Sequence, residues 1–183
     1  HHQLDFNIPS HEEIIISHDL SDEEQKLYAS LRSVLKRVVE KRKEDKRRSA
    51  GILSTIAYLR QFLVCPLVPC KSLMYRTTTG IMSRYYRKIV KRMELKELLK
   101  RQSCESSRIR EIVKVLDAHC KERCIVFNCF RTNTIEIMKY LELIRDERPR
   151  FTMIAKHSIS ERMNIINMFE KTPNGILFLT YQL

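Results

Sequence analysis

The sequence predicts an α/β fold in which a mostly helical segment precedes a partial parallel sheet. The chain of 183 residues contains only three glycines and five prolines, and 31% of its residues are charged, which favours long helices. In its second half, three short apolar runs alternate with helical patterns. This is the order of strands and crossover helices in a parallel sheet.

The chain begins with a pattern that predicts one strand and one helix. The apolar EIIIS run at residues 13–17 predicts a short buried strand. A helix is then expected from Ser21, because Glu24 follows three residues later and completes a capping box. The apolar positions expected to face inward are Leu27, Leu31, Val34, Leu35 and Val38.

Two further helices are expected before residue 102. One runs over residues 51–64 and ends at Pro66 and Pro69, because proline cannot continue a helix. Residues 70–80 resemble a loop, and the next helix covers residues 81–101. The predicted inward face of the helix over 51–64 consists of Ile52, Ile56, Leu59 and Leu63.

The second half of the chain predicts three strands. The runs CIVF, FTMI and ILFL occupy residues 124–127, 151–154 and 176–179. The first run is continuously apolar, as expected of a strand that is covered on both faces. The strands would therefore form a parallel sheet with right-handed crossovers.

Three helices are expected around these strands. The first is capped by Ser106 or Ser107, the second covers residues 132–145, and the third begins at a capping box of Ser158 and Glu161. A boundary with the helical segment is expected near residues 102–105. The predicted inward residues are Ile109, Ile112, Val113, Leu116, Ile135, Met138, Leu141, Met163, Ile166 and Phe169.

Composition excludes several classes of protein. Three scattered glycines cannot form a phosphate loop or a dinucleotide fingerprint. The apolar run at residues 62–68 is much shorter than the roughly 20 residues of a membrane span. Six cysteines without a secretory signal indicate free thiols in a reducing compartment. No CxxC pair supports a zinc site, so we expect no metal at the closely spaced residues His119, Cys120, Cys124 and Cys129.

The positive charge is concentrated in one segment. Of the net charge of +12, residues 71–101 contribute +8 from ten basic and two acidic side chains. Such a stripe is typical of binding to nucleic-acid phosphates, although a solvated helix face gives the same pattern.

Several segments, in order, resemble signatures of the Swi/Snf-type chromatin-remodelling ATPases. HDLSDEEQKLY at residues 18–28 is similar to the segment that leads into that family's helical region, and LRQFLVCP at 59–66 resembles its helix ending at Cys and Pro. SSRIREIVKVL at 106–116 resembles the Ser-x-Lys helix that opens the second RecA-like lobe, with Arg108 in place of Lys.

The resemblance continues to the end of the chain. Residues 123–141 resemble helicase motif IV, residues 158–169 the helix that follows it, and residues 176–183 the beginning of motif V. Ala155 departs from the pattern, which usually has Gly, and the basic helix matches no signature.

The resemblance implies three parts of the chain. Residues 1–20 would be an initial strand and linker from a missing first lobe, and residues 21–102 a helical protrusion. Residues 103–183 would be the first half of the second RecA-like lobe, truncated at motif V.

The resemblance also implies contacts with the DNA backbone at the carboxyl edge of the sheet. Arg can form charge-assisted bonds to phosphate, and a helix beginning at Thr132 favours an anion. Alternatively, Thr132 caps the helix, Thr180 is an ordinary strand residue, and Arg131 and Lys156 are solvated. The candidate nucleic-acid-binding residues are Asn128, Arg131, Thr132, Lys156 and Thr180, together with Arg84, Arg87, Lys88 and Lys91 of the basic helix. No spacing supports a catalytic residue.

The expected function is that of a fragment of an ATP-dependent double-stranded DNA translocase. The parent protein would use ATP and Mg²⁺, whereas the fragment alone would be inactive. Expected partners are double-stranded DNA and a nucleosome or other DNA-bound protein, in the nucleus or at a cytoplasmic viral replication site. Two alternatives remain open: a non-enzymatic basic DNA- or protein-binding module, and an RNA helicase or viral or transcription-associated nucleoside triphosphatase.

Overall fold

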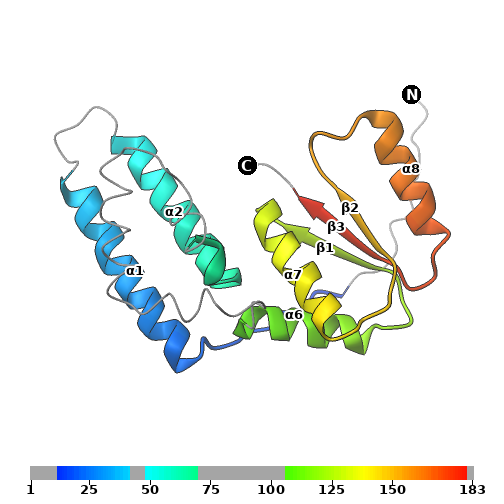
Figure 1. Cartoon of the computed structure of the whole chain (residues 1–183), viewed down its shortest axis with the longest axis horizontal. Coiled ribbons are helices and arrows are strands. Elements are labelled where there is room, and N and C mark those ends of the chain that lie inside the picture. The colour runs from blue at the N-terminus through cyan, green and yellow to red at the C-terminus, as the bar shows by residue number, and fades with distance from the viewer. Residues whose placement is uncertain (1–11, 42–47, 70–105, 181–183) are drawn as a thin grey trace.

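The computed structural model describes residues 12–41, 48–69 and 106–180. Two helices lie side by side at one end, and a small sheet with its covering helices forms the rest (Figure 1). The predicted helix over residues 81–101 and the predicted boundary near 102–105 lie outside the described residues.

The helical part consists of α1 (Asp22–Lys41) and α2 (Arg48–Val64). The predicted capping box is confirmed, because the Ser21 amide donates to Glu24 Oε2 at 2.9 Å and the Glu24 amide donates to Ser21 Oγ at 3.3 Å. The buried apolar residues of α1 include Leu27, Leu31 and Leu35, as predicted. Tyr28 of α1 contacts Phe62 of α2, with ring centroids 5.7 Å apart.

Two predictions about this part are wrong. Residues 13–17 form no strand, and their isoleucines are exposed, because no described strand pairs with them. The predicted face of α2 is wrong at Ile56, which is 46% exposed, whereas Ile52, Leu59 and Leu63 are partly buried as predicted. Phe62, which was not predicted to face inward, is 1% exposed and contacts Tyr28 of α1.

The sheet contains β1 (Cys124–Asn128), β2 (Arg150–Met153) and β3 (Ile176–Thr180). The strand order is β1–β3–β2 and both pairings are parallel, so the predicted parallel sheet is confirmed. As the central strand, β3 is buried along most of its length. The predicted run of strand, helix, strand, helix and strand thus forms one compact unit.

The two faces of the sheet are covered unequally. Helices α6 (Ser107–Ala118) and α7 (Arg131–Leu143) pack on one face, where the buried cluster includes Ile176 and Phe178. Helix α8 (Ile159–Glu170) contacts β2, and its Phe169 packs edge-on against Phe151.

The prediction that the first strand is covered on both faces is wrong. Ile125 is 51% exposed and Phe127 is 64% exposed, whereas Val126 packs against the core. The reason is that β1 is an edge strand of the described sheet and α8 lies over β2, two strands away.

The helix bounds agree with the predictions within a few residues, but some of the inward faces do not. Ile135 is 39% exposed and Met163 is 52% exposed, although both were predicted to face inward. In α7 the fully buried apolar residues are Ile137 and Leu141. The packed face of this helix therefore includes Ile137, two residues after Ile135, rather than Ile135 itself. Among the alternatives for the α6 cap, Ser106 is the N-cap, and its Oγ accepts from the Ile109 amide at 3.1 Å.

The helical part is joined to the sheet part at the start of α6. Oε1 of Glu24 accepts a hydrogen bond of 2.9 Å from the Ser107 amide, while Ser106 Oγ donates to the Val64 carbonyl at 2.6 Å. One serine pair thus contacts the beginning of α1 and the end of α2. These bonds satisfy helix-end groups that otherwise lack partners.

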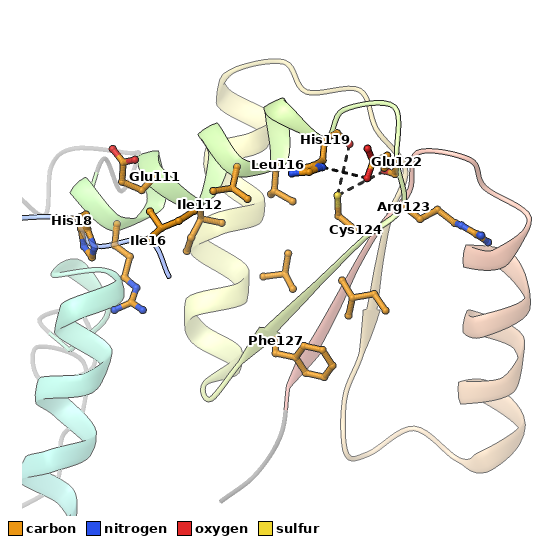
Figure 2. Close-up of a pocket in the computed structure, with 14 residues that line it drawn as sticks. Ile16, His18, Glu111, Ile112, Leu116, His119, Glu122, Arg123, Cys124 and Phe127 are labelled. Carbon is orange, nitrogen blue, oxygen red and sulfur yellow. Dashed lines mark hydrogen bonds and ion pairs between the residues drawn. The ribbon is translucent and has the colours of Figure 1, made fainter. Parts of the chain in front are cut away.

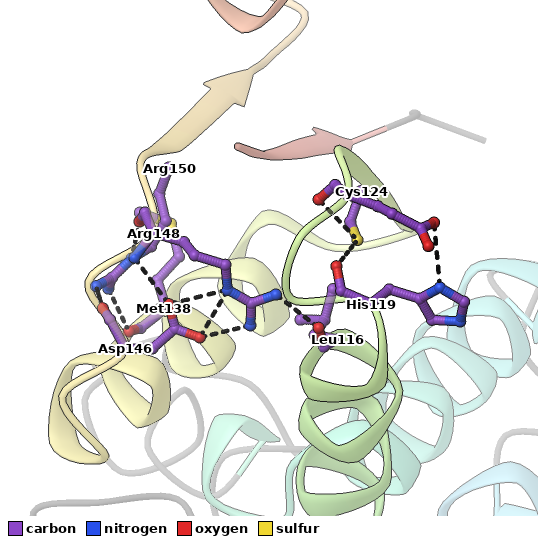
Figure 3. Close-up of polar contacts among 8 residues, drawn as sticks. Leu116, His119, Cys124, Met138, Asp146, Arg148 and Arg150 are labelled. Atoms are coloured by element: carbon purple, nitrogen blue, oxygen red, sulfur yellow. Dashed lines mark hydrogen bonds and ion pairs between the residues drawn. The ribbon is translucent and has the colours of Figure 1, made fainter. Parts of the chain in front are cut away.

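A second set of buried polar contacts fixes the turn from α7 to β2 (Figure 3). Arg148 lies against Asp146 with a shortest contact of 2.5 Å, and its Nη1 donates to the Leu116 carbonyl at 2.6 Å. Arg150 Nη2 donates to the Asp146 carbonyl. Arg148 thereby ties the end of α6 to the start of β2.

Candidate nucleic-acid interface

The carboxyl ends of the three strands meet at one edge of the sheet. Asn128 at the end of β1 is paired in register with Thr180 at the end of β3, and Met153 of β2 is paired with Leu179. In an open α/β sheet, ligands bind outside this edge. The turns that leave β1 and β2 therefore form the candidate site, together with the end of β3.

The turn after β1 leads directly into α7. Its N-cap is Phe130, which makes no side-chain capping bond, and Arg131 and Thr132 are exposed in the first helical turn. The alternative that Thr132 caps this helix is therefore wrong. A helix start without a side-chain cap presents unpaired amides and the positive end of the helix dipole, which together favour an anion.

Asn128 has a structural contact within this turn. Its side chain is 8% exposed, and Nδ2 donates to Thr134 Oγ1 at 3.2 Å. Thr134 is itself 1% exposed. Asn128 therefore positions the exposed residues that follow it.

Thr180 and Lys156 occupy the rest of the edge. Thr180 is half-buried, and within the described residues its Oγ1 has no hydrogen-bond partner. Lys156 is exposed in the turn between β2 and α8. Because β3 lies between the other two strands, Thr180 stands between the turn after β1 and the turn that holds Lys156.

The start of α8 is held by local bonds. The predicted capping box is confirmed, since Ser158 Oγ accepts from the Glu161 amide and Glu161 Oε2 accepts from the Ser158 amide at 2.7 Å. The hydrogen bonds from Ser158 lower the pKa of Glu161. Arg162 Nη2 donates to the Ala155 carbonyl at 2.9 Å, so this arginine holds the turn that carries Lys156.

A groove of about 460 Å³ lies beside the turn after β1. It runs between the end of α2, the face of α6 and the start of α7. Arg60 of α2 reaches the turn, where Nη2 donates to Cys129 Sγ at 3.2 Å. Arg108 and the 1%-exposed Asn133 also line it.

Two residues of this groove, Arg60 and Asn133, were not among the candidates predicted from sequence. Arg60 lies 69 residues before Cys129 in the chain, so only the packing of α2 against the sheet part brings them together. Arg108 could have been identified from sequence, because it occupies the position of the lysine in the Ser-x-Lys signature that this segment resembles.

A second cavity, of about 500 Å³, follows the outer edge of β1 (Figure 2). It lies beneath α6, and Ile16 and His18 border it from the segment before α1. At its other end, His119 Nδ1 lies 3.2 Å from Glu122 Oε2, and both side chains are exposed. Its two arginines, Arg108 and Arg123, are accompanied by the carboxylates Glu111 and Glu122, whereas no carboxylate is among the described residues that line the groove beside α7.

The predicted absence of a zinc site concerns the same region. Within the ranges that the structure describes, no group of three His, Cys, Asp or Glu side chains is arranged to hold a metal ion. Burial raises the pKa of the Cys124 thiol, an effect that nearby Arg148 partly offsets. The thiolate form, which would bind a metal, is thereby disfavoured.

The remaining candidates, Arg84, Arg87, Lys88 and Lys91, lie outside the described residues. None of the described helices is long and apolar enough to cross a membrane.

Solved structures share this fold. The Sulfolobus solfataricus SWI2/SNF2 ATPase C-terminal domain is 21% identical, with a TM-score of 0.51, over 89% of this chain and 60% of that chain. The C-terminal part of the Fun30 ATPase domain is 15% identical, with a TM-score of 0.57, over 91% and 67% of the two chains. The S. solfataricus SWI2/SNF2 ATPase core domain is 19% identical, with a TM-score of 0.54, over 90% and 29%. No protein-family model matches the chain, and no curated protein matches it.

These similarities establish the fold. The chain has the α/β fold of the C-terminal part of SWI2/SNF2 ATPase domains, with a RecA-like parallel sheet, and spans 60% of the length of the first of these domains. The fold that the sequence signatures implied is therefore confirmed.

Proposed function

We propose that this chain forms part of the second lobe of an ATP-driven double-stranded DNA translocase, and that the carboxyl edge of its sheet contacts the phosphates of one strand. The observation that carries the proposal is the start of α7. There, Arg131 and Thr132 are exposed on a helix end without a side-chain cap, at the edge of the sheet where Thr180 ends β3.

These groups suit a phosphodiester backbone. Arg131 can donate two parallel bonds to phosphate oxygens, and the amides of the first turn add donors aligned with the helix dipole. Thr180 Oγ1 is buried and no described residue engages it, so a phosphate would reach this hydroxyl only after the side chain rotates outward. Such contacts recognise phosphates and not bases, so the binding would be independent of sequence, as movement along DNA requires.

ATP and Mg²⁺ belong to the parent protein in this proposal. The described residues include no acidic set arranged as a magnesium site, and the sequence has no phosphate loop. The role proposed for this lobe is to grip the strand while the complete motor opens and closes. We expect this chain alone to hydrolyse no ATP.

The proposal predicts a loss of DNA affinity when charge is removed from the edge. Arg131→Gln with Lys156→Gln should make the plot of log K against log salt shallower by about 2, because each lost phosphate contact removes about 0.9 from the slope. The measurement is fluorescence anisotropy with a 20-base-pair duplex at several salt concentrations.

A matched control removes the same charge from the opposite edge. Lys121 and Lys171 are exposed and lie just before β1 and β3. Lys121→Gln with Lys171→Gln should leave the slope near that of the unaltered chain. Equal slopes for the two double variants would contradict the proposal, and a preference for RNA duplex over DNA duplex would favour the RNA-helicase alternative.

A further inference from the structure

We propose that the groove between α2, α6 and the start of α7 is a second phosphate-binding site, in which Arg60 and Arg108 together hold one phosphate group. The inference rests on the proposed function only in its preferred source of phosphate, a nucleic-acid strand. The geometry itself points to a phosphate group from either a strand or a free nucleotide.

The charge of the groove is one-sided. Arg60 and Arg108 line it from two different helices, and among its described lining residues none is Asp or Glu. Arg60 is fixed on the turn by its bond to Cys129. Both arginines are exposed, and no hydrogen bond or ion pair to a described residue engages the Arg108 guanidinium. Two guanidinium groups without a balancing carboxylate favour an anion.

Asn133 supplies the second observation. Its side chain is 1% exposed and lines the groove, yet within the described residues its Oδ1 has no hydrogen-bond partner. A buried amide oxygen without a partner is costly. A half-turn about the Cβ–Cγ bond exchanges oxygen and nitrogen, so the same amide can donate to a ligand oxygen in the groove.

The start of α7 completes the donor set. Asn133 belongs to the first turn of this 13-residue helix, which has no side-chain cap. The Asn133 amide itself donates to the Phe130 carbonyl at 3.0 Å, so the first-turn amides left as donors for an anion are those of Arg131 and Thr132.

The test replaces both arginines and follows two ligands. Arg60→Gln with Arg108→Gln is compared with Arg32→Gln with Arg110→Gln, which removes two exposed arginines from α1 and α6 outside the groove. One ligand is a 20-base-pair DNA duplex, measured by anisotropy against salt. The other is ATP without Mg²⁺, measured by calorimetry.

The groove variant should lose binding that the control variant keeps. For a nucleic-acid phosphate, its salt slope should be shallower than that of the control by about 1. For a nucleotide phosphate, its affinity for ATP should fall about tenfold, which corresponds to the loss of one charge-assisted contact. Either result supports the site and identifies the source, whereas equality of the two variants in both arms overturns it.

Two further measurements keep the result decisive. Arg60→Lys with Arg108→Lys retains the charge, so it should keep most of the DNA slope even if the glutamine variant folds poorly. If the edge variant at Arg131 and Lys156 keeps the salt slope of the unaltered chain while the groove variant loses binding, the proposed function is rejected and the groove site is supported. The reverse pattern would reject this site alone.

Discussion

Glu24 is a single residue that stabilises the ends of two helices. One carboxylate oxygen accepts from the Ser21 amide at the start of α1, and the other accepts from the Ser107 amide at the start of α6. Burial by itself raises the pKa of this carboxyl, but the hydrogen bonds from Ser107 and Ser21 outweigh that effect and leave the pKa below its usual value. The ionised form therefore stabilises the fold.

The lowered pKa predicts a specific dependence of stability on pH. A carboxyl with a depressed folded pKa contributes stability above its unfolded pKa of about 4.5, and loses it as pH falls through the lower folded value. Glu24→Gln should cost about 1–2 kcal/mol at pH 7, because one buried amide loses its acceptor. Denaturant unfolding should show this difference shrinking below pH 4.5, and a difference that stays constant down to pH 2 would contradict the role.

Loss of the buried Arg148 side chain should reduce stability more than loss of the Glu24 carboxylate. Both it and Asp146 are about nine-tenths buried, so removal of the arginine leaves a carboxylate and the Leu116 carbonyl without this donor. Arg148→Gln should lower the free energy of unfolding by about 3 kcal/mol. Lys114→Gln breaks an exposed pair of similar length with Glu111 and should cost less than about 0.5 kcal/mol. Equal costs in urea melts would show that burial of the Arg148 pair adds nothing.

At the scale of elements, β1 has two faces with different partners. Val126 packs against the core formed with α6 and α7, whereas Ile125 and Phe127 point away from it and are more than half exposed. An apolar edge strand with an exposed face promotes association between chains.

This alternation predicts opposite results for neighbouring positions. Phe127→Lys should change the melting temperature little and raise the concentration at which the chain precipitates. Val126→Lys should abolish cooperative unfolding, because it places a charge in the core. Thermal melts followed by circular dichroism, with turbidity against concentration, check both expectations. A large loss of stability in Phe127→Lys would mean that the outer face of β1 is packed.

The elements were predictable from sequence where their signals are local. Capping boxes at Ser21 and Ser158 fix helix starts through residues three apart, and apolar runs placed all three strands. Exposure was less predictable, because it depends on which strand lies at the edge. The run at 124–127 is apolar throughout, yet it occupies an edge, and the isoleucines at 14–16 find no partner strand among the described residues.

The site was predictable only in part for a related physical reason. Parallel topology brings strand ends together, so the positions of Arg131, Thr132 and Thr180 at one edge of the sheet could be predicted from the apolar runs before them, whereas their contact with DNA stays a prediction. Asn128 occupies the expected place but bonds to Thr134, which the pattern could not indicate. Arg60 depends on the packing of α2 against a turn 69 residues away, and no local pattern encodes that contact.

At the scale of the whole molecule, the helical part and the sheet part contribute residues to one surface. The bonds from Ser106 and Ser107 hold α1 and α2 against the sheet part, and this brings α2 beside the turn after β1. The carboxyl edge and the groove are therefore neighbours on the same side of the fold. A strand bound at the edge would pass close to the groove.

The most direct test of the central proposal is an amide NMR titration of the isotope-labelled chain with a short DNA duplex. The proposal predicts that shifts concentrate at residues 128–134, 154–158 and 179–180, where the strands end and the following turns begin. The amino ends of the strands, at residues 119–123, 146–150 and 171–175, should stay unchanged. Shifts confined to the amino ends, with the carboxyl edge unaffected, would contradict the proposal that this edge holds the DNA backbone.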